Sequence, residues 1–163
     1  MTRRMRRAVL VLHIASAGAW IGVDVVLGVL VFTALSTSDT RTAATCYQAL
    51  ELFAVWPLLS VGLVCLVSGV TLGLGSRYGL VRYWWVATKL ALTVVLVLLV
   101  LFALRPGLYE AADYGRRLAD GEPGSGPPSM LIYPPLVSTT ALLFAVLLSV
   151  YKPWGRISVR VKS

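Results

Sequence analysis

The sequence predicts an all-α fold, an antiparallel bundle of four transmembrane helices, and three observations support this prediction. Of the 163 residues, 58% are hydrophobic and 13% are charged, about half of the roughly 25% charged residues of soluble domains. The apolar residues gather in four long runs, and the basic residues are distributed unevenly around these runs. A single histidine and two cysteines supply little material for a zinc cage or a disulfide framework.

Each of the four runs has the length needed to cross a bilayer. They cover about residues 8–33, 52–74, 83–104 and 131–150, and each is close to or above the ~20 residues that span ~30 Å of hydrocarbon. Because backbone groups in lipid must be satisfied within the segment, helices are expected rather than strands. The remaining segments are too short to bury cores of their own, so residues 1–163 are predicted to form one domain.

The start of the first run has two interpretations. Four arginines, an apolar stretch and the small residues Ala15 and Ala17 resemble a signal peptide with its cleavage site. The apolar stretch continues past Ala17 to Leu35, which is too long for a signal sequence and long enough to span. An uncleaved first helix is therefore the preferred interpretation.

Residues 34–51, 75–82 and 105–130 are expected to connect the four spans. The last of these connections divides into two parts, because residues 108–120 contain one glycine and no proline. They are expected to form a short polar helix outside the membrane. Residues 121–128, Gly-Glu-Pro-Gly-Ser-Gly-Pro-Pro, have the composition of a flexible linker.

The basic residues predict which side of the membrane each end occupies. Ten of the fifteen lie before the first run, between the second and third runs, or after the fourth run. Since lysine and arginine near span ends mark the cytoplasmic side, both termini are expected in the cytoplasm. This face is expected to bind anionic lipids. No basic stretch has the interleaved aromatics of a nucleic-acid surface, so no nucleic-acid partner is expected.

Small residues at helical spacing predict close helix packing. Gly18 and Gly22 in the first run, and Gly69 and Gly73 in the second, form GxxxG patterns. The fourth run contains a similar row of small residues, Ser138, Ala141, Ala145 and Ser149. Together these rows favour a tight bundle, and either GxxxG pair is a candidate interface for a homo-oligomer.

Polar side chains inside a membrane are costly, so they are the first functional candidates. His13, Trp20 and Asp24 share one face of the first helix. Eleven residues at 1.5 Å each place about 16 Å between His13 and Asp24, too far for contact. His13 is interpreted as a ligand of haem b or copper, as a proton-carrying group, or as a neutral imidazole bonded to a neighbouring helix. The neutral imidazole is preferred, so no cofactor is expected.

Asp24 is interpreted either as a proton or cation site or as half of an ion pair. The ion pair is preferred, with Arg105 as partner, because a long arginine side chain can reach inward. Lys89 is expected to extend toward the cytoplasmic headgroups, or else to flank a polar pocket with His13. Cys46 is expected in an outer loop, free or paired between chains, too far from a deep Cys65 for an intrachain disulfide.

Two patterns resemble known families. The first run contains the pattern His13, six further residues, and then Trp20-Ile-Gly22. This pattern resembles the first helix of a bacterial group that includes the copper-resistance D domain and the membrane-bound haem-biosynthesis oxidases. The resemblance implies haem or metal at His13, although this chain has no second histidine. A second resemblance rests on Tyr83-Trp-Trp-Val86 with Lys89 and on the ending 149–155. These segments are similar to those of small four-helix integral membrane proteins of actinobacteria, a family whose domain has no known function. This similarity implies a bacterial cytoplasmic membrane and carries no activity.

The sequence therefore predicts a non-enzymatic membrane component or subunit of unassigned molecular function. One alternative is a haem- or copper-linked membrane redox protein that uses His13. The other is a small proton- or cation-coupled carrier that uses Asp24.

Overall fold

The computed structural model describes residues 1–76, 79–122, 126, 130–152 and 155, and within these residues it is all-helical, without strands. The elements in chain order are α1 (Arg3–Ser36), α2 (Thr40–Ala54), α3 (Trp56–Leu74), α4 (Trp84–Leu99), the π-helical turn η1 (Val100–Leu104), α5 (Arg105–Ala119) and α6 (Tyr133–Tyr151). Most of the predicted linker 121–128 lies outside the described residues.

Four helical stretches are long and apolar enough to cross a membrane, which confirms the four predicted runs. They are Arg3–Ser36, Thr40–Leu74, Trp84–Ala119 and Tyr133–Tyr151. Helix α6 has 19 residues, or about 28 Å at 1.5 Å per residue, close to the ~30 Å of hydrocarbon. The other three stretches have 34 to 36 residues and therefore extend well beyond the length of α6.

The expected connection 34–51 contains most of an additional helix, α2. Helix α2 begins after Asp39, whose carboxylate accepts a hydrogen bond from the Thr42 backbone N–H at 3.0 Å, a typical N-terminal cap. It ends before Pro57, whose ring and missing N–H break the regular backbone pattern. Helices α2 and α3 consequently follow one another with a break at Val55.

The expected polar helix 108–120 is confirmed as part of α5, which starts three residues earlier. Helix α4 continues into α5 through η1, and Pro106 stands at the start of α5. A proline cannot donate to the preceding turn and its ring clashes with the carbonyl four residues back. The wider π turn at Val100–Leu104 accommodates this mismatch without ending the helix.

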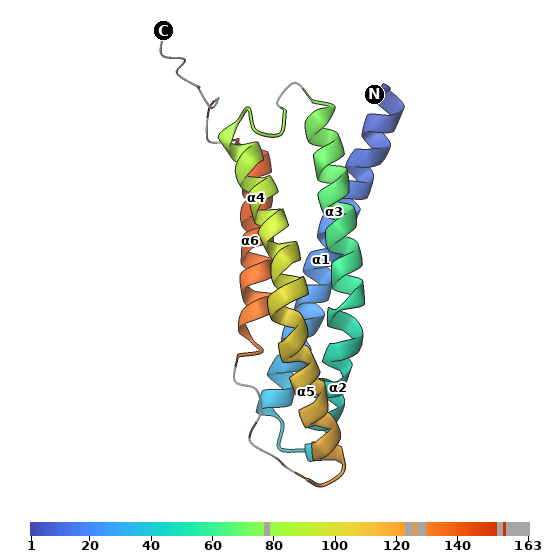
Figure 1. The fold of residues 1–163 in the computed structure, drawn as a ribbon, viewed down its shortest axis with the longest axis vertical. Coiled ribbons are helices and arrows are strands. Elements are labelled where there is room, and N and C mark those ends of the chain that lie inside the picture. Colours follow the sequence, from blue (N-terminus) through green and yellow to red (C-terminus); the bar gives the residue numbers. More distant parts are fainter. Residues whose placement is uncertain (77–78, 123–125, 127–129, 153–154, 156–163) are drawn as a thin grey trace.

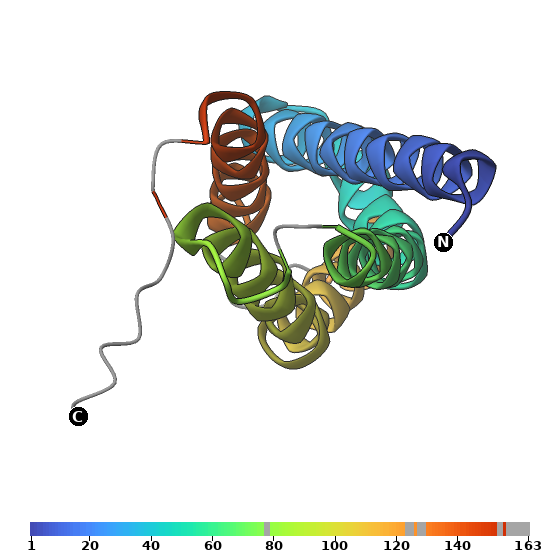
Figure 2. The same ribbon diagram turned by 90° about the horizontal axis from the view of Figure 1, so that it is seen from above.

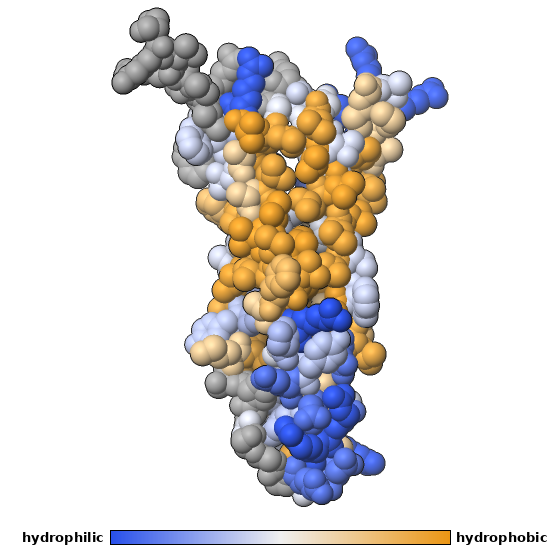
Figure 3. Space-filling model, viewed as in Figure 1, coloured by the Kyte–Doolittle hydropathy of each residue, from blue (hydrophilic) through white to orange (hydrophobic). Residues whose placement is uncertain are grey.

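The helices form a bundle in which α1 and α4 each contact both α3 and α6 (Figures 1 and 2). The N-terminus and the end of α6 lie at the same end of this bundle, and α2 and α5 pack together at the opposite end (Figure 1). On the face viewed in Figure 3, an apolar band covers the bundle and polar side chains cover the end formed by α5.

The contact between α2 and α5 depends on small residues. Ala111 and Ala112 of α5 are completely buried, and a Cβ atom at Gly115 would lie 2.8 Å from the Tyr47 Cβ and 2.9 Å from the Ala44 carbonyl oxygen. At the surface, Arg116 pairs with Glu51 across the two helices at 3.1 Å. Exposed ion pairs contribute little stability, so close backbone packing holds this pair of helices together.

Candidate functional site: a polar face inside the bundle

The buried face of α1 carries the polar residues of the bundle interior. Ser16, Trp20 and Asp24 are 6%, 0% and 2% exposed. On the other side of α1, a Cβ atom at Gly18 or Gly22 would meet no atom within 4 Å. The predicted shared face of Trp20 and Asp24, opposite the two glycines, is therefore confirmed. Ser16 was not among the predicted residues.

His13 is held by α3. Its Nδ1 lies 3.0 Å from the Cys65 carbonyl oxygen and 3.0 Å from the Ser68 Oγ, and the Cys65 thiol is 3.8 Å away. The imidazole lies against Gly69, where a Cβ atom would be 3.0 Å from its Cε1. These contacts agree with the interpretation of His13 as an imidazole bonded to a neighbouring helix.

Trp20 fills the centre of the bundle. A Cβ atom at Gly62 of α3 would lie 3.0 Å from the indole ring and 3.4 Å from the Val97 side chain of α4. The indole of α1 thus reaches the region where α3 and α4 meet. Its Nε1–H is buried and has no hydrogen-bond partner among the described residues.

Asp24 faces α6. The hydroxyls of Ser138 and Thr139 lie beside its carboxylate, and in the described part of the chain neither its Oδ2 nor the buried Ser138 Oγ makes a hydrogen bond. Ser138 is five residues from the start of α6, so Asp24 lies about 8 Å inside that end of the helix. Counted over the residues that the structure describes, three buried polar atoms therefore lack a hydrogen-bond partner: Asp24 Oδ2, Ser138 Oγ and Trp20 Nε1.

The expected ion pair between Asp24 and Arg105 is wrong. Arg105 begins α5, beyond the π turn, and its exposed guanidinium lies 5.8 Å from the centroid of the Tyr109 ring. Among the described residues, the ion pairs join Arg116 and Arg117 to acidic residues of α2 and α5. Asp24 therefore has no cationic partner in this part of the structure.

Lys89 also lies far from Asp24. Its Nζ donates a hydrogen bond to the Ser149 Oγ at 2.9 Å and lies 4.9 Å from the centroid of the Trp85 ring. Ser149 and Ser138 are eleven residues apart on α6, or about 16 Å. Lys89 thus occupies the end of the bundle that holds the N-terminus, and Asp24 lies toward the other end.

The rows of small residues on α1 and α3 have different surroundings. The row on α3 packs inside the chain, because Gly62 and Gly69 lie against Trp20 and His13, and Gly73 is buried. The proposed oligomer interface at Gly69 and Gly73 is therefore occupied by this chain's own residues, His13 of α1 and Leu80 of the connection between α3 and α4. Gly18 and Gly22 are exposed, so their row takes no part in the bundle.

The two cysteines are free. Cys46 lies in α2 rather than in a loop, and it is 8% exposed. Cys65 lies in α3, near His13. Within the described ranges, no three histidine, cysteine, aspartate or glutamate side chains gather around one point.

Comparisons with known protein families, with curated proteins and with solved structures find no match to this chain. The site is consequently interpreted from its own geometry.

Proposed function

We propose that the protein is a non-enzymatic integral membrane protein of a bacterial cytoplasmic membrane, with four antiparallel spans and both termini in the cytoplasm. The apolar length of α6 matches one bilayer. Aromatic side chains stand exposed near both ends of the spans, at Trp56 and Tyr133 on one side and at Trp84 and Tyr151 on the other. Such rings favour the headgroup level. The basic residues at the N-terminal end then contact anionic lipids.

Accessible cysteines test this topology. Because Cys46 and Cys65 are buried, both are replaced by serine before new cysteines are introduced. Val81, between α3 and α4, is 69% exposed, and Glu110 is exposed on α5. A membrane-impermeant thiol reagent should label Glu110→Cys in intact cells and Val81→Cys only after lysis. The reverse pattern, or labelling of both in intact cells, contradicts the proposed orientation.

We infer that Asp24 gives this protein a site for a proton or a small cation, and that it works as a small carrier or as the ion-binding subunit of a larger assembly. The observation that carries this inference is a carboxylate 2% exposed, with one oxygen unpartnered and no cationic partner in the described chain. An uncompensated buried charge costs several kcal/mol in order of magnitude. A bound proton or cation removes that charge.

The atoms around Asp24 indicate which ions can bind at the site. The carboxylate and the hydroxyls of Ser138 and Thr139 supply oxygen atoms, which are the ligands of hard cations rather than of soft metals. The Trp20 Nε1–H is a donor, and it can bond a water molecule or a carboxylate oxygen, but no cation. The arrangement therefore favours a proton, or a hard monovalent cation such as Na⁺ with water.

Flux through liposomes tests the carrier. Purified protein is reconstituted with a pH-sensitive dye inside the vesicles, and a proton or Na⁺ gradient is imposed. We expect Asp24→Asn, which keeps the shape of the side chain, to reduce flux to the level of empty vesicles. The matched variant Glu110→Gln removes an exposed carboxylate and should leave flux unchanged. Equal flux for the wild type and Asp24→Asn overturns the carrier role.

A second candidate is a copper-linked role for His13. Cys65 places a thiol 3.8 Å from the imidazole, and thiolate and imidazole are both copper ligands. Haem fits this place poorly, since the ring lies against Gly69, its Nδ1 is hydrogen-bonded, and the chain has no second histidine to serve as another axial ligand.

The visible spectrum and metal content of the purified protein test this second candidate. Copper that copurifies with the wild type and is lost in His13→Ala and in Cys65→Ser supports it. A Soret band lost in His13→Ala supports the haem alternative instead. A colourless preparation without copper excludes both roles.

The exposed Gly18 and Gly22 are the remaining candidates for a homo-oligomer interface. A bulky Gly22→Leu variant should shift the protein to a smaller species in size-exclusion chromatography coupled to light scattering. An identical mass for the wild type and the variant contradicts this interface.

A further inference from the structure

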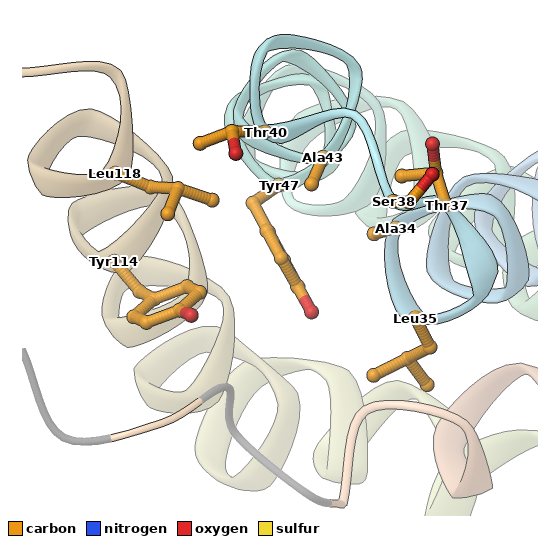
Figure 4. A pocket seen from close by; sticks show the side chains of 9 residues that line it. All are labelled: Ala34, Leu35, Thr37, Ser38, Thr40, Ala43, Tyr47, Tyr114 and Leu118. Atoms are coloured by element: carbon orange, nitrogen blue, oxygen red, sulfur yellow. The ribbon is translucent and has the colours of Figure 1, made fainter. Parts of the chain in front are cut away.

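A second polar site lies outside the apolar band, where the end of α1 meets α2 and α5. A cavity of about 190 Å³ opens between these helices (Figure 4). Ala34 of α1 lines it, ten residues or about 15 Å along the helix from Asp24. The cavity is therefore separate from the proposed ion site.

The cavity has an aromatic wall. Tyr47 of α2 and Tyr114 of α5 stand edge to face, with ring centroids 5.3 Å apart and an interplanar angle of 86°. Leu118 lies beside Tyr114 on α5, and Leu35 lines the cavity from the opposite side of Tyr47 (Figure 4). Aromatic rings prefer edge-to-face or offset contacts with other rings, so the wall suits a third ring.

Hydroxyl groups supply the polar part of the lining. Tyr47 is only 2% exposed, and its ring extends from α2 into the cavity with the hydroxyl at its tip (Figure 4). Three further lining residues carry hydroxyl groups: Thr37 and Ser38 in the connection between α1 and α2, and Thr40 at the start of α2. Every lining residue is uncharged.

We propose that this cavity binds a small uncharged molecule built on one aromatic ring that carries a hydroxyl group. The volume agrees with this class, because a cavity of about 150 Å³ accepts benzene. The two tyrosine rings contact the face and edge of the ligand ring, and the Tyr47 hydroxyl bonds to its hydroxyl. A charged ligand is disfavoured, since no lining residue offers a compensating charge.

Calorimetric titration of the full-length protein in detergent with phenol as the probe tests the proposal. We expect phenol to bind more tightly than benzene, which lacks the hydroxyl, and than benzoate, which is charged. Tyr47→Phe should weaken phenol binding about two- to tenfold, the worth of one hydrogen bond. Tyr109→Phe, a tyrosine away from the cavity, should leave binding unchanged.

A bulky substitution that fills the cavity provides a second test of phenol binding. Thr40→Phe places a ring at the cavity lining, and its matched control Thr45→Phe changes an exposed threonine of α2 that does not line the cavity. Phenol binding should be lost in the first variant and kept in the second, with equal helix content by circular dichroism. No phenol binding by the wild type, equal binding of benzene, or preferential binding of glucose overturns the proposal. None of these outcomes bears on Asp24.

Discussion

The indole ring of Trp20 lies against Gly62, so close that a Cβ atom on the glycine would be 3.0 Å from two ring carbons. This contact places the largest side chain of the α1 inner face at the centre of the bundle, beside Val97 of α4. It also fixes the rotation of α1, which turns Asp24 toward α6.

The Trp20–Gly62 contact predicts that Gly62→Ala destabilises the bundle. The new methyl group meets a rigid, fully buried ring, and such overpacking costs about 1–3 kcal/mol. Unfolding in detergent measures the loss. Gly22→Ala is the matched control, because its methyl group meets nothing within 4 Å; equal losses in the two variants contradict the packing of Trp20 on α3.

The contact of His13 with Gly69 predicts coupling between these two positions. Gly69→Ala should destabilise the wild type, because its Cβ atom meets the imidazole at 3.0 Å. The same substitution should cost less in a His13→Ala background, with a coupling energy of about 0.5–3 kcal/mol. A double-mutant cycle of unfolding free energies measures it. Additive effects would show that the imidazole does not lie on Gly69.

The pair of helices α2 and α5 should be sensitive at Gly115. In Gly115→Ala the methyl group meets the Tyr47 Cβ and the Ala44 carbonyl oxygen, so the helices must move apart. We expect a loss of about 3 kcal/mol in unfolding free energy. Gly107→Ala, on the same helix with open space around it, should be neutral or stabilise by up to about 1 kcal/mol. Similar effects of the two substitutions contradict the observed α2–α5 packing.

The cap of α2 should depend on pH. Hydrogen bonds from the hydroxyl and the backbone N–H of Thr42 hold the pKa of Asp39 below its ordinary value of 3.8. Because the folded pKa is the lower one, the stabilisation is complete above 3.8 and is lost as pH falls through the folded value. The protection factors of the first-turn amides of α2, which are hydrogen-exchange rates compared with the intrinsic rate at each pH, should therefore fall in acid.

Asp39→Asn is the control for this cap, because asparagine also caps helices but does not titrate in this range. Its amide protection should not change between neutral and acidic pH. The same acid-induced loss in Asp39→Asn would assign the effect to another group.

The four long apolar helices could be predicted from sequence because hydrophobic length is a local property, and the shared face of Trp20 and Asp24 follows from helical periodicity alone. Helix α2 carried a weaker signal: Ala43, Tyr47, Leu50 and Ala54 recur at helical spacing. Its charged and hydroxyl residues and its short length made it resemble a connection.

The partners of the polar residues depend on how the helices pack, which periodicity does not specify. The position of Arg105 is a consequence of the π turn before Pro106. The contact of His13 with Cys65 and Ser68 requires the close approach that Gly69 permits. Ser138 belongs to the row of small residues in the fourth run. Its hydroxyl group, which lies in an apolar run, is the sequence signal that could have marked Ser138 as part of the site.

The most direct test of the central claim, that Asp24 binds a proton or small cation, is difference infrared spectroscopy of the reconstituted protein. Spectra are compared across pH and across Na⁺ concentration for the wild type and Asp24→Asn. We expect a carboxyl band that changes with pH or Na⁺ in the wild type and is missing in Asp24→Asn. Identical difference spectra for the two proteins would contradict the claim.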